Sequence, residues 1–198
     1  MRLILMRHGE TLWNQESRLQ GHDNSSLSNK GIQQAEKLKD SIRLLSPVRI
    51  ICSDLGRARQ TAGIIGYSHA ITDPALRELH MGEWTGLRKP DLIADEPEKY
   101  WQWRKGLYTP PGGESWEDFC QRIHQALMGW IEKEDTDLLA IVHSGVIRAA
   151  CKVFMKLPPE NLLPVTPATL TIFNIEQGKT RLEAYNIGAF IPDADAAD

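Results

Sequence analysis

Three short apolar runs, each followed by a segment with helical spacing, constrain the fold more than any other feature of this sequence. They occupy residues 2–6, 48–52 and 138–142. Each run is apolar on both faces and too short for an average helix, which indicates a strand buried on both sides. Buried strands that alternate with helices predict an α/β fold in which helices cover both faces of a mostly parallel sheet. The 198 residues suit one domain, which we assign to residues 1–198.

A helix is expected after each of these strands. Residues 28–45 carry apolar side chains at helical spacing, and Ser28 can cap the first turn. A second helix is expected from about residue 54 to residue 65, with Ser53 as its N-cap. A third is expected from residue 144 to about residue 155.

The remaining segments depart from this simple alternation. Residues 116–131 predict a helix whose apolar stripe belongs to the core, with Ser115 as its N-cap and Asp118 as the capping partner. Residues 170–175 and 181–185 predict a hairpin, so the sheet should be mixed. Residues 78–113, rich in aromatic side chains, predict a small cap inserted over one end of the sheet. The acidic tail, about residues 191–198, is expected to be flexible.

Composition narrows the classes of partner. The net charge is -3 with acidic and basic residues interleaved, so no basic stripe indicates nucleic-acid binding. No apolar run has the length of a membrane span, and the N-terminus is too soon interrupted by Arg7 to be a signal peptide. We therefore expect a cytoplasmic protein that binds neither nucleic acid nor membrane. Cys52, Cys120 and Cys151 are expected to be buried free thiols.

Charged side chains gather where the three predicted strands end. The first strand ends in "MRHGET" with Arg7 and His8, the second is followed by Ser53 and Arg57, and the third by His143. If the strands are neighbours, their carboxyl ends meet at one rim, which is where open α/β sheets bind ligands. Two arginines, two histidines and the amides of helix N-termini predict a site for a doubly charged anion, most simply a phosphoryl group.

A structural interpretation of the same residues stays open at this point. A single histidine at a strand end often only forms a structural hydrogen bond, and an arginine in a first helical turn is often a surface charge. Glu10 and Glu78 could supply counter-charge to the cluster without any ligand.

The motifs themselves carry a resemblance. "RHGET", "SDLGRARQTA", "LRELHMGEWTG", "PPGGES" and "VHSGVIR" occur in this order over nearly the whole chain. In this they resemble the histidine phosphatase superfamily, also called the phosphoglycerate mutase-like family. The resemblance implies a three-layer α/β/α sandwich with a mostly parallel sheet. It also implies that His8 is the nucleophile, that Arg7, Arg57 and His143 hold the phosphate oxygens, and that Glu78 donates a proton to the leaving oxygen, with Glu83 as the rival.

Further positions are candidate substrate contacts. Asn14 matches a polar pocket residue of the family, and we add Gln20, Gly21, Ser144 and Trp84. Two departures from the family pattern concern substrate identity more than chemistry. Val142 and Ser144 flank the second histidine where the family usually has Ser or Thr and then Gly. In "EWTG", threonine replaces the acid of the family's "WEG".

The chemistry suits these residue types. A neutral imidazole can attack phosphorus directly, and the cations Arg7 and Arg57 would lower the pKa of His8. A hydrogen bond from its other ring nitrogen to a backbone carbonyl near Gly9 would fix the tautomer. Gly9 would also let the chain turn sharply past the phosphate. No carboxylate cluster of the kind that holds Mg²⁺ is visible, so we expect no metal and no cofactor.

Three functional classes are compared. A phosphomonoester hydrolase is favoured over a phosphoglycerate mutase, because mutases that resemble this family carry a longer insertion rich in basic residues. It is also favoured over a catalytically silent binding protein, because His8 and Glu78 are both present. The aromatic cap, including Tyr100, Trp101 and Trp103, either packs on itself or stacks on a flat substrate group. The chain length, the "PPGGES" segment and the aromatic cap together resemble α-ribazole phosphatases, whose substrate carries a flat base. A broad-specificity phosphatase of sugar phosphates, nucleotides or phosphoserine is the alternative, and the chain is expected to be a monomer or homodimer.

Overall fold

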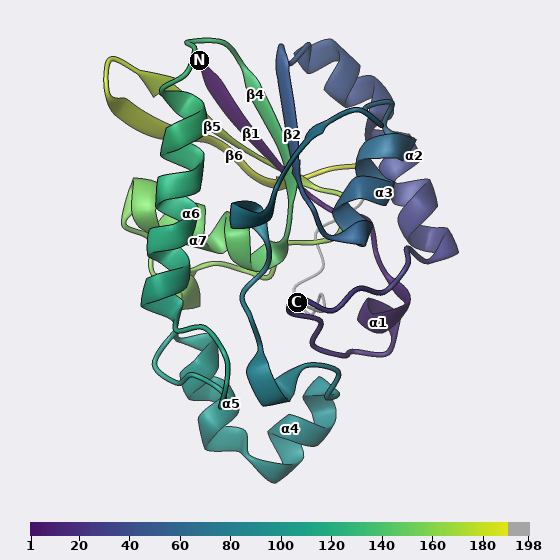
Figure 1. The fold of residues 1–198 in the computed structure, drawn as a ribbon, viewed down its shortest axis with the longest axis vertical. Coiled ribbons are helices and arrows are strands. Elements are labelled where there is room, and N and C mark those ends of the chain that lie inside the picture. The colour runs from purple at the N-terminus through teal and green to yellow at the C-terminus, as the bar shows by residue number, and fades with distance from the viewer. Residues whose placement is uncertain (190–198) are drawn as a thin grey trace.

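A six-stranded mixed sheet forms the centre of the computed structural model, which describes residues 1–189 (Figure 1). Its order is β3-β2-β4-β1-β5-β6; the first four strands run parallel, and β5 runs antiparallel to both of its neighbours, β1 and β6. The predicted mixed sheet and hairpin are therefore confirmed. The strands are β1 (Arg2–Arg7), β2 (Arg49–Ser53), β3 (Ile71–Asp73), β4 (Leu138–Val142), β5 (Leu170–Glu176) and β6 (Lys179–Ile187).

Helices cover both faces of the sheet, which confirms the α/β/α layering (Figure 1). Alternate residues of β1 point to opposite faces, as the pleat requires. Leu3 and Leu5 pack with α6 and α7, whereas Ile4 and Met6 pack with α2 and α3. The helices are α1 (Leu12–Gln15), α2 (Asn29–Leu45), α3 (Gly56–Ile64), α4 (Lys89–Asp95), α5 (Pro97–Arg104), α6 (Trp116–Ile131) and α7 (Ser144–Met155), with 3-10 turns at Pro74–Leu76, Gly82–Trp84 and Pro159–Asn161.

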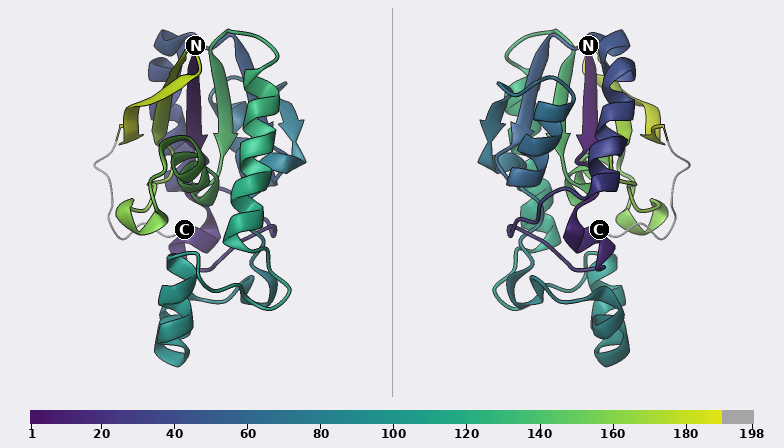
Figure 2. Two further views of the ribbon diagram at one scale, coloured as in Figure 1. Left: turned by 90° about the vertical axis from the view of Figure 1, so that its left-hand side faces the viewer. Right: turned by 90° about the vertical axis from the view of Figure 1, so that its right-hand side faces the viewer.

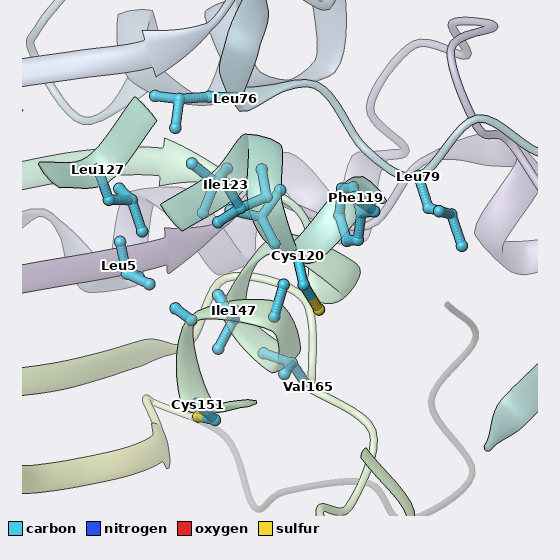
Figure 3. Close-up of a cluster of buried hydrophobic side chains, with 14 of the residues drawn as sticks. Leu5, Leu76, Leu79, Phe119, Cys120, Ile123, Leu127, Ile147, Cys151 and Val165 are labelled. Carbon is cyan, nitrogen blue, oxygen red and sulfur yellow. The ribbon is translucent and has the colours of Figure 1, made fainter. Parts of the chain in front are cut away.

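The apolar stripe of α6 belongs to the core, as predicted. Figure 3 shows Phe119, Ile123 and Leu127 of this helix beside Leu5 of β1 and Ile147 of α7. All five side chains are fully buried, and each such burial stabilises the fold by roughly 1.5–3 kcal/mol. The three cysteines are buried free thiols, also as predicted. Within residues 1–189, no helix has the length and apolar character needed to cross a bilayer.

Two predicted helix caps are confirmed and one is wrong. Ser28 and Ser115 accept hydrogen bonds from amides of the first turns of α2 and α6. Ser53 does not cap α3, because it is the last residue of β2 and the helix begins only at Gly56. The amide of Arg57 instead donates to Asn24 Oδ1 at 2.8 Å. The cap of α3 therefore comes from a loop that is distant in the sequence.

The inserted segment predicted to form a cap, residues 78–113, extends beyond the carboxyl ends of the parallel strands (Figure 2). It contains α4 and α5, which the polar sequence did not predict; each has a proline in its first turn. Trp84 and Trp103 are buried against each other with ring centres 5.8 Å apart, and Tyr108 lies 5.4 Å from Trp84. Aromatic packing therefore holds the cap together. The tail predicted to be flexible, residues 191–198, lies outside the described residues.

Candidate active site

The sheet register brings the predicted strand-end residues together. Arg7 is paired with Val142 where β1 and β4 run side by side, so His8 and His143 follow neighbouring strand ends. Their ring centres are 5.3 Å apart. Strand β2 lies on the other side of β4, and Arg57 is in the first turn of the helix that follows it. Arg7, His8, Arg57 and His143 are all nearly fully buried, and we call them the strand-end cluster.

The ring of His8 is fixed in one tautomer. Its Nδ1 lies 2.7 Å from the carbonyl oxygen of Gly9, and a carbonyl can only accept, so Nδ1 carries the proton. The lone pair is then on Nε2. Burial lowers the pKa of His8 well below its ordinary value, and the charges of Arg57 and Arg7 lower it further. The imidazole is therefore neutral at physiological pH, as a nucleophile must be.

Gly9 is required for a different reason from the predicted sharp turn. It is absent from the glycines with positive φ. A Cβ at this position would instead lie 2.5 Å from the carbonyl oxygen of Gly31 at the start of α2. The amide of Gly9 also donates to Thr61 Oγ1 at 3.1 Å. Close packing between two backbones thus sets the position of the chain beside His8.

The two arginines form a buried positive site. Arg7 donates to the carbonyl of Val165, and Arg57 donates to those of Gly21 and Asp23 at 2.8 and 2.7 Å. Burial lowers the pKa of each arginine to about 10, while the charge of Glu78 opposes this. Both side chains therefore stay charged at pH 7. Two buried cations held by carbonyls are suited to bind an anion, which would offset their desolvation.

His143 supplies unused hydrogen-bonding capacity. It precedes α7, is fully buried, and neither ring nitrogen has a hydrogen-bond partner within the described part of the chain. Burial lowers the pKa of His143 well below its ordinary value, and the charge of Arg57 contributes to the same shift. A neutral imidazole can still donate one N–H to a phosphate oxygen. Ser144 is the first residue of α7 and is buried beside it, so its amide belongs to the positive end of the helix.

Glu78 is held against the start of the same helix. Its carboxylate accepts hydrogen bonds from the amide of Leu79 at 2.8 Å and from that of Gly145 at 3.0 Å. A Cβ at position 145 would lie 2.1 Å from Glu78 Oε1, so only glycine allows this approach. The rival proton donor, Glu83, is exposed, and its amide bonds to Pro111 within the cap. The geometry therefore favours Glu78.

The predicted counter-charge at Glu10 is directed elsewhere. Glu10 forms an ion pair with Lys30 at 2.9 Å and accepts from Ser28 at 2.8 Å. Its charge still raises the pKa of Arg7. Glu10 therefore anchors the start of α2 through Lys30 and Ser28.

The remaining candidate substrate contacts differ in their placement. Asn14 is buried; its Oδ1 accepts from Thr11, and its Nδ2 has no partner within residues 1–189. Gln20 is also buried, and Gly21 receives the hydrogen bond from Arg57. Trp84 packs in the aromatic cluster of the cap and is 4% exposed, so the geometry gives it a structural environment.

Two arginines beside Glu78, the buried Arg148 and the half-buried Arg104, were not singled out from the sequence. Arg148 of α7 and Arg104 of α5 line a narrow cavity of about 20 Å³ together with Glu78, Gly145, Leu79, Met81, Trp103 and Trp116. Burial, together with the like charge of Arg104, lowers the pKa of Arg148 to about 9. The signal was present in "VHSGVIR", because a charged residue in an otherwise apolar helix is unusual.

Comparison with known proteins agrees with this geometry. The histidine phosphatase superfamily (branch 1) matches residues 3–188. The chain belongs to this superfamily. A probable phosphoglycerate mutase of Erwinia tasmaniensis is 38% identical over 80% of this chain and 76% of its own length. Mycobacterial glucosyl-3-phosphoglycerate phosphatase, solved with VO3, has a TM-score of 0.87 and 31% identity over 93% of this chain and 98% of its own.

A second solved structure is similar across its whole length. The α-ribazole phosphatase of Shigella flexneri has a TM-score of 0.82 and 27% identity over 98% of this chain and all of its own. Relatives in this superfamily therefore include both phosphatases and mutases. The protein is an enzyme of the histidine phosphatase type. Within residues 1–189, no three His, Cys, Asp or Glu side chains are placed to hold a metal ion.

Proposed function

We propose that the protein hydrolyses phosphomonoesters through a covalent phosphohistidine at His8. The observation that carries the proposal is the fixed tautomer of His8 inside a buried cationic cluster. Nδ1 is bonded to Gly9 at 2.7 Å, which leaves Nε2 as the nucleophile, and the charges of Arg7 and Arg57 act on the same ring. This arrangement combines a neutral nucleophile with two cations for the phosphate oxygens.

In the first step, His8 Nε2 forms a bond to phosphorus, and the bond between phosphorus and the ester oxygen breaks. The electron pair of that bond goes to the leaving oxygen, which takes a proton from Glu78. The charge on the equatorial oxygens is held by Arg7, Arg57, His143 and the amides at the start of α7.

In the second step, water attacks phosphorus, and the bond to Nε2 breaks. Glu78, now a carboxylate, takes a proton from that water, so the same residue serves as acid and then as base. Inorganic phosphate leaves and His8 returns to its neutral form. No metal enters either step.

Hydrolysis is favoured over the mutase alternative because of the cap. Its helices α4 and α5 carry mixed charge and aromatic side chains, in contrast to the basic insertion expected of a mutase. The mutase alternative predicts that phosphate returns to the organic acceptor and that little inorganic phosphate appears.

Two substrate types are candidates. The indoles of Trp103 and Trp116 line the cavity beside Glu78 and suit a flat group such as the base of α-ribazole 5'-phosphate. A volume of about 20 Å³ has room for about one water, so the side chains of the cap must move to admit such a base. The guanidiniums of Arg104 and Arg148 line the same cavity and suit a phosphorylated carboxylic acid. A broad-specificity enzyme would accept both, together with sugar phosphates, nucleotides and phosphoserine.

The test combines an activity assay with the capture of the intermediate. Wild type should release phosphate from p-nitrophenyl phosphate in EDTA, and His8→Ala should abolish release. Rapid quenching with labelled substrate should trap protein-bound label that is acid-labile and alkali-stable. Acid-stable label, or activity retained in His8→Ala, would contradict the proposal. His69→Ala, an exposed histidine, is the matched control and should keep activity.

The substrate panel decides between the candidates. The kcat/KM values of α-ribazole 5'-phosphate, 3-phosphoglycerate and glycerol 3-phosphate should be compared under one condition. A preference for the first supports stacking, a preference for the second over the third supports anion recognition, and similar values for all three indicate broad specificity.

A further inference from the structure

Glu78 lies in a stretch of chain that no regular element holds. Residues 77–81 are neither helical nor extended in a strand, between the 3-10 turns Pro74–Leu76 and Gly82–Trp84. Leu76 and Leu79, on either side of Glu78, are buried in the apolar cluster that Figure 3 shows around α6. The carboxylate itself accepts from the amides of Leu79 and Gly145, and further polar contacts hold the backbone of the segment that carries it.

One guanidinium supplies most of those contacts. Arg122, on α6, donates from Nη1 to the carbonyls of Ala75 and Arg77 at 2.8 and 3.0 Å, and from Nη2 to that of Glu78 at 3.3 Å. Its forked geometry lets it bind several carbonyls of one segment at once. The side chain of His22 donates to the same Glu78 carbonyl at 2.9 Å. The backbone on the N-terminal side of the carboxylate is therefore tied to α6.

The same guanidinium also holds the segment that returns from the cap. Its Nε and Nη2 form a bidentate pair with the carboxylate of Glu114 at 2.8 and 2.7 Å. The amide of Glu114 donates to the carbonyl of His80 at 2.9 Å. The two side chains are only 25% and 18% exposed, so water competes weakly for these bonds. Arg122 thus binds the backbone up to Glu78, and Glu114 binds the backbone that follows it.

We propose that Arg122, held by Glu114, is a positioning residue for the proton donor Glu78 and couples the cap to proton transfer. This inference rests on the proposed function. Arg122 touches neither phosphate nor leaving group; it sets where the carboxyl of Glu78 lies relative to the leaving oxygen. A displacement near 1 Å at a catalytic group can cost about 100-fold in rate.

Leaving-group dependence separates positioning from a merely structural role. An alkoxide leaves poorly without a proton, whereas p-nitrophenolate leaves readily without one. The quantity to measure is the ratio of kcat/KM for glycerol 3-phosphate to kcat/KM for p-nitrophenyl phosphate, because kcat/KM reports the step in which the leaving group departs. Arg122→Met should lower this ratio by about 10- to 100-fold. Arg122→Lys should lower it less, because one ammonium keeps the charge and replaces some of the bonds.

Arg49 offers a matched control. It also donates to three backbone carbonyls, those of Trp130, Glu134 and Thr136 at 2.6, 2.7 and 2.8 Å, and it lies at the start of β2, away from the strand-end cluster. Arg49→Met removes equivalent bonds and should leave the ratio as in wild type. Glu78→Gln sets the largest change that loss of the donor can produce.

Each outcome decides the proposal. A folded Arg122→Met that loses activity equally on both esters would overturn it, since that is the signature of a structural role. If Arg122→Met fails to fold, Glu114→Gln decides, because it weakens the bidentate pair at almost constant shape and should lower the ratio in the same direction; an unchanged ratio overturns the proposal. An unchanged ratio in Glu78→Gln, or no acid-labile phosphoenzyme in wild type, would instead show failure of the proposed function.

Discussion

The strand-end cluster and the cap helices are built in different ways. Arg7, His8 and His143 are placed by β1 and β4, whose hydrogen-bonded register leaves little freedom. Helices α4 and α5 have no hydrogen-bonding N-cap side chain and are held by aromatic packing. Trp101 of α5 and Leu107, which follows that helix, are largely exposed. Hydrogen-bonded pairing of strands fixes where the side chains at their ends lie, whereas apolar side-chain packing tolerates substitutions of similar volume. We therefore expect the proposed phosphoryl chemistry to depend on the strand-end cluster, whereas substrate specificity can vary in the cap without disturbing that cluster.

The largest effect is expected from Arg57→Met in the strand-end cluster. Because the phosphoryl group is common to all substrates, kcat/KM should fall by about 100- to 1000-fold for every ester alike. Steady-state assays on p-nitrophenyl phosphate and on an alkyl phosphate measure this. Arg59→Met, an exposed arginine on the same helix, is the control and should change little. If the loss of kcat/KM depended strongly on the ester, substrate specificity would lie in the strand-end cluster as well, and the contrast with the cap helices would not hold.

An intermediate effect is expected from acidification. The pKa values of His8 and His143 are lowered in the folded protein, so below about pH 6.5 the unfolded chain binds more protons than the folded one. The free energy of unfolding should therefore decrease as the pH is lowered below about 6.5. The decrease is about 1.4 kcal/mol per pH unit for each histidine, until the pKa of that histidine in the folded protein is reached. Urea unfolding between about pH 7 and pH 5 measures the slope, and His143→Asn should reduce it by one histidine's share.

The two regions should also differ in this respect. Helices α4 and α5 contain no histidine, so a substitution there should leave the pH slope unchanged. A His143→Asn slope equal to that of wild type would show that this imidazole is not held neutral by its surroundings.

The smallest effect is expected from Trp101→Ala on the outer face of α5. The side chain is 54% exposed and makes an edge contact with the ring of Tyr100, with ring centres 5.2 Å apart. The free energy of unfolding should change by about 0.5 kcal/mol or less, and kcat/KM for p-nitrophenyl phosphate should stay within about twofold. Thermal unfolding and the standard assay check both. A large loss of activity with normal stability would mean that the cap acts through its outer face.

Much of the fold could be predicted because it follows from local patterns. The ends of β4 and α7 agree with the predicted bounds, since a continuous apolar strand followed by a helical stripe has a clear boundary. The segments that were missed lack such patterns. Strand β3 has only three residues, two of them exposed, and forms only by pairing with β2. Helices α4 and α5 are polar and short, and their aromatic contacts decide them.

The sequence alone determined which residue types stand at the ends of the core strands, because strand period and helix start are local properties. It therefore indicated Arg7, His8, Arg57 and His143 together. Only the tertiary structure decided that Asn24 caps α3, that Gly145 accommodates Glu78, and that Arg104 and Arg148 meet beside it. These contacts join residues far apart in the chain, and no local pattern encodes them, since they arise only when separate elements pack together.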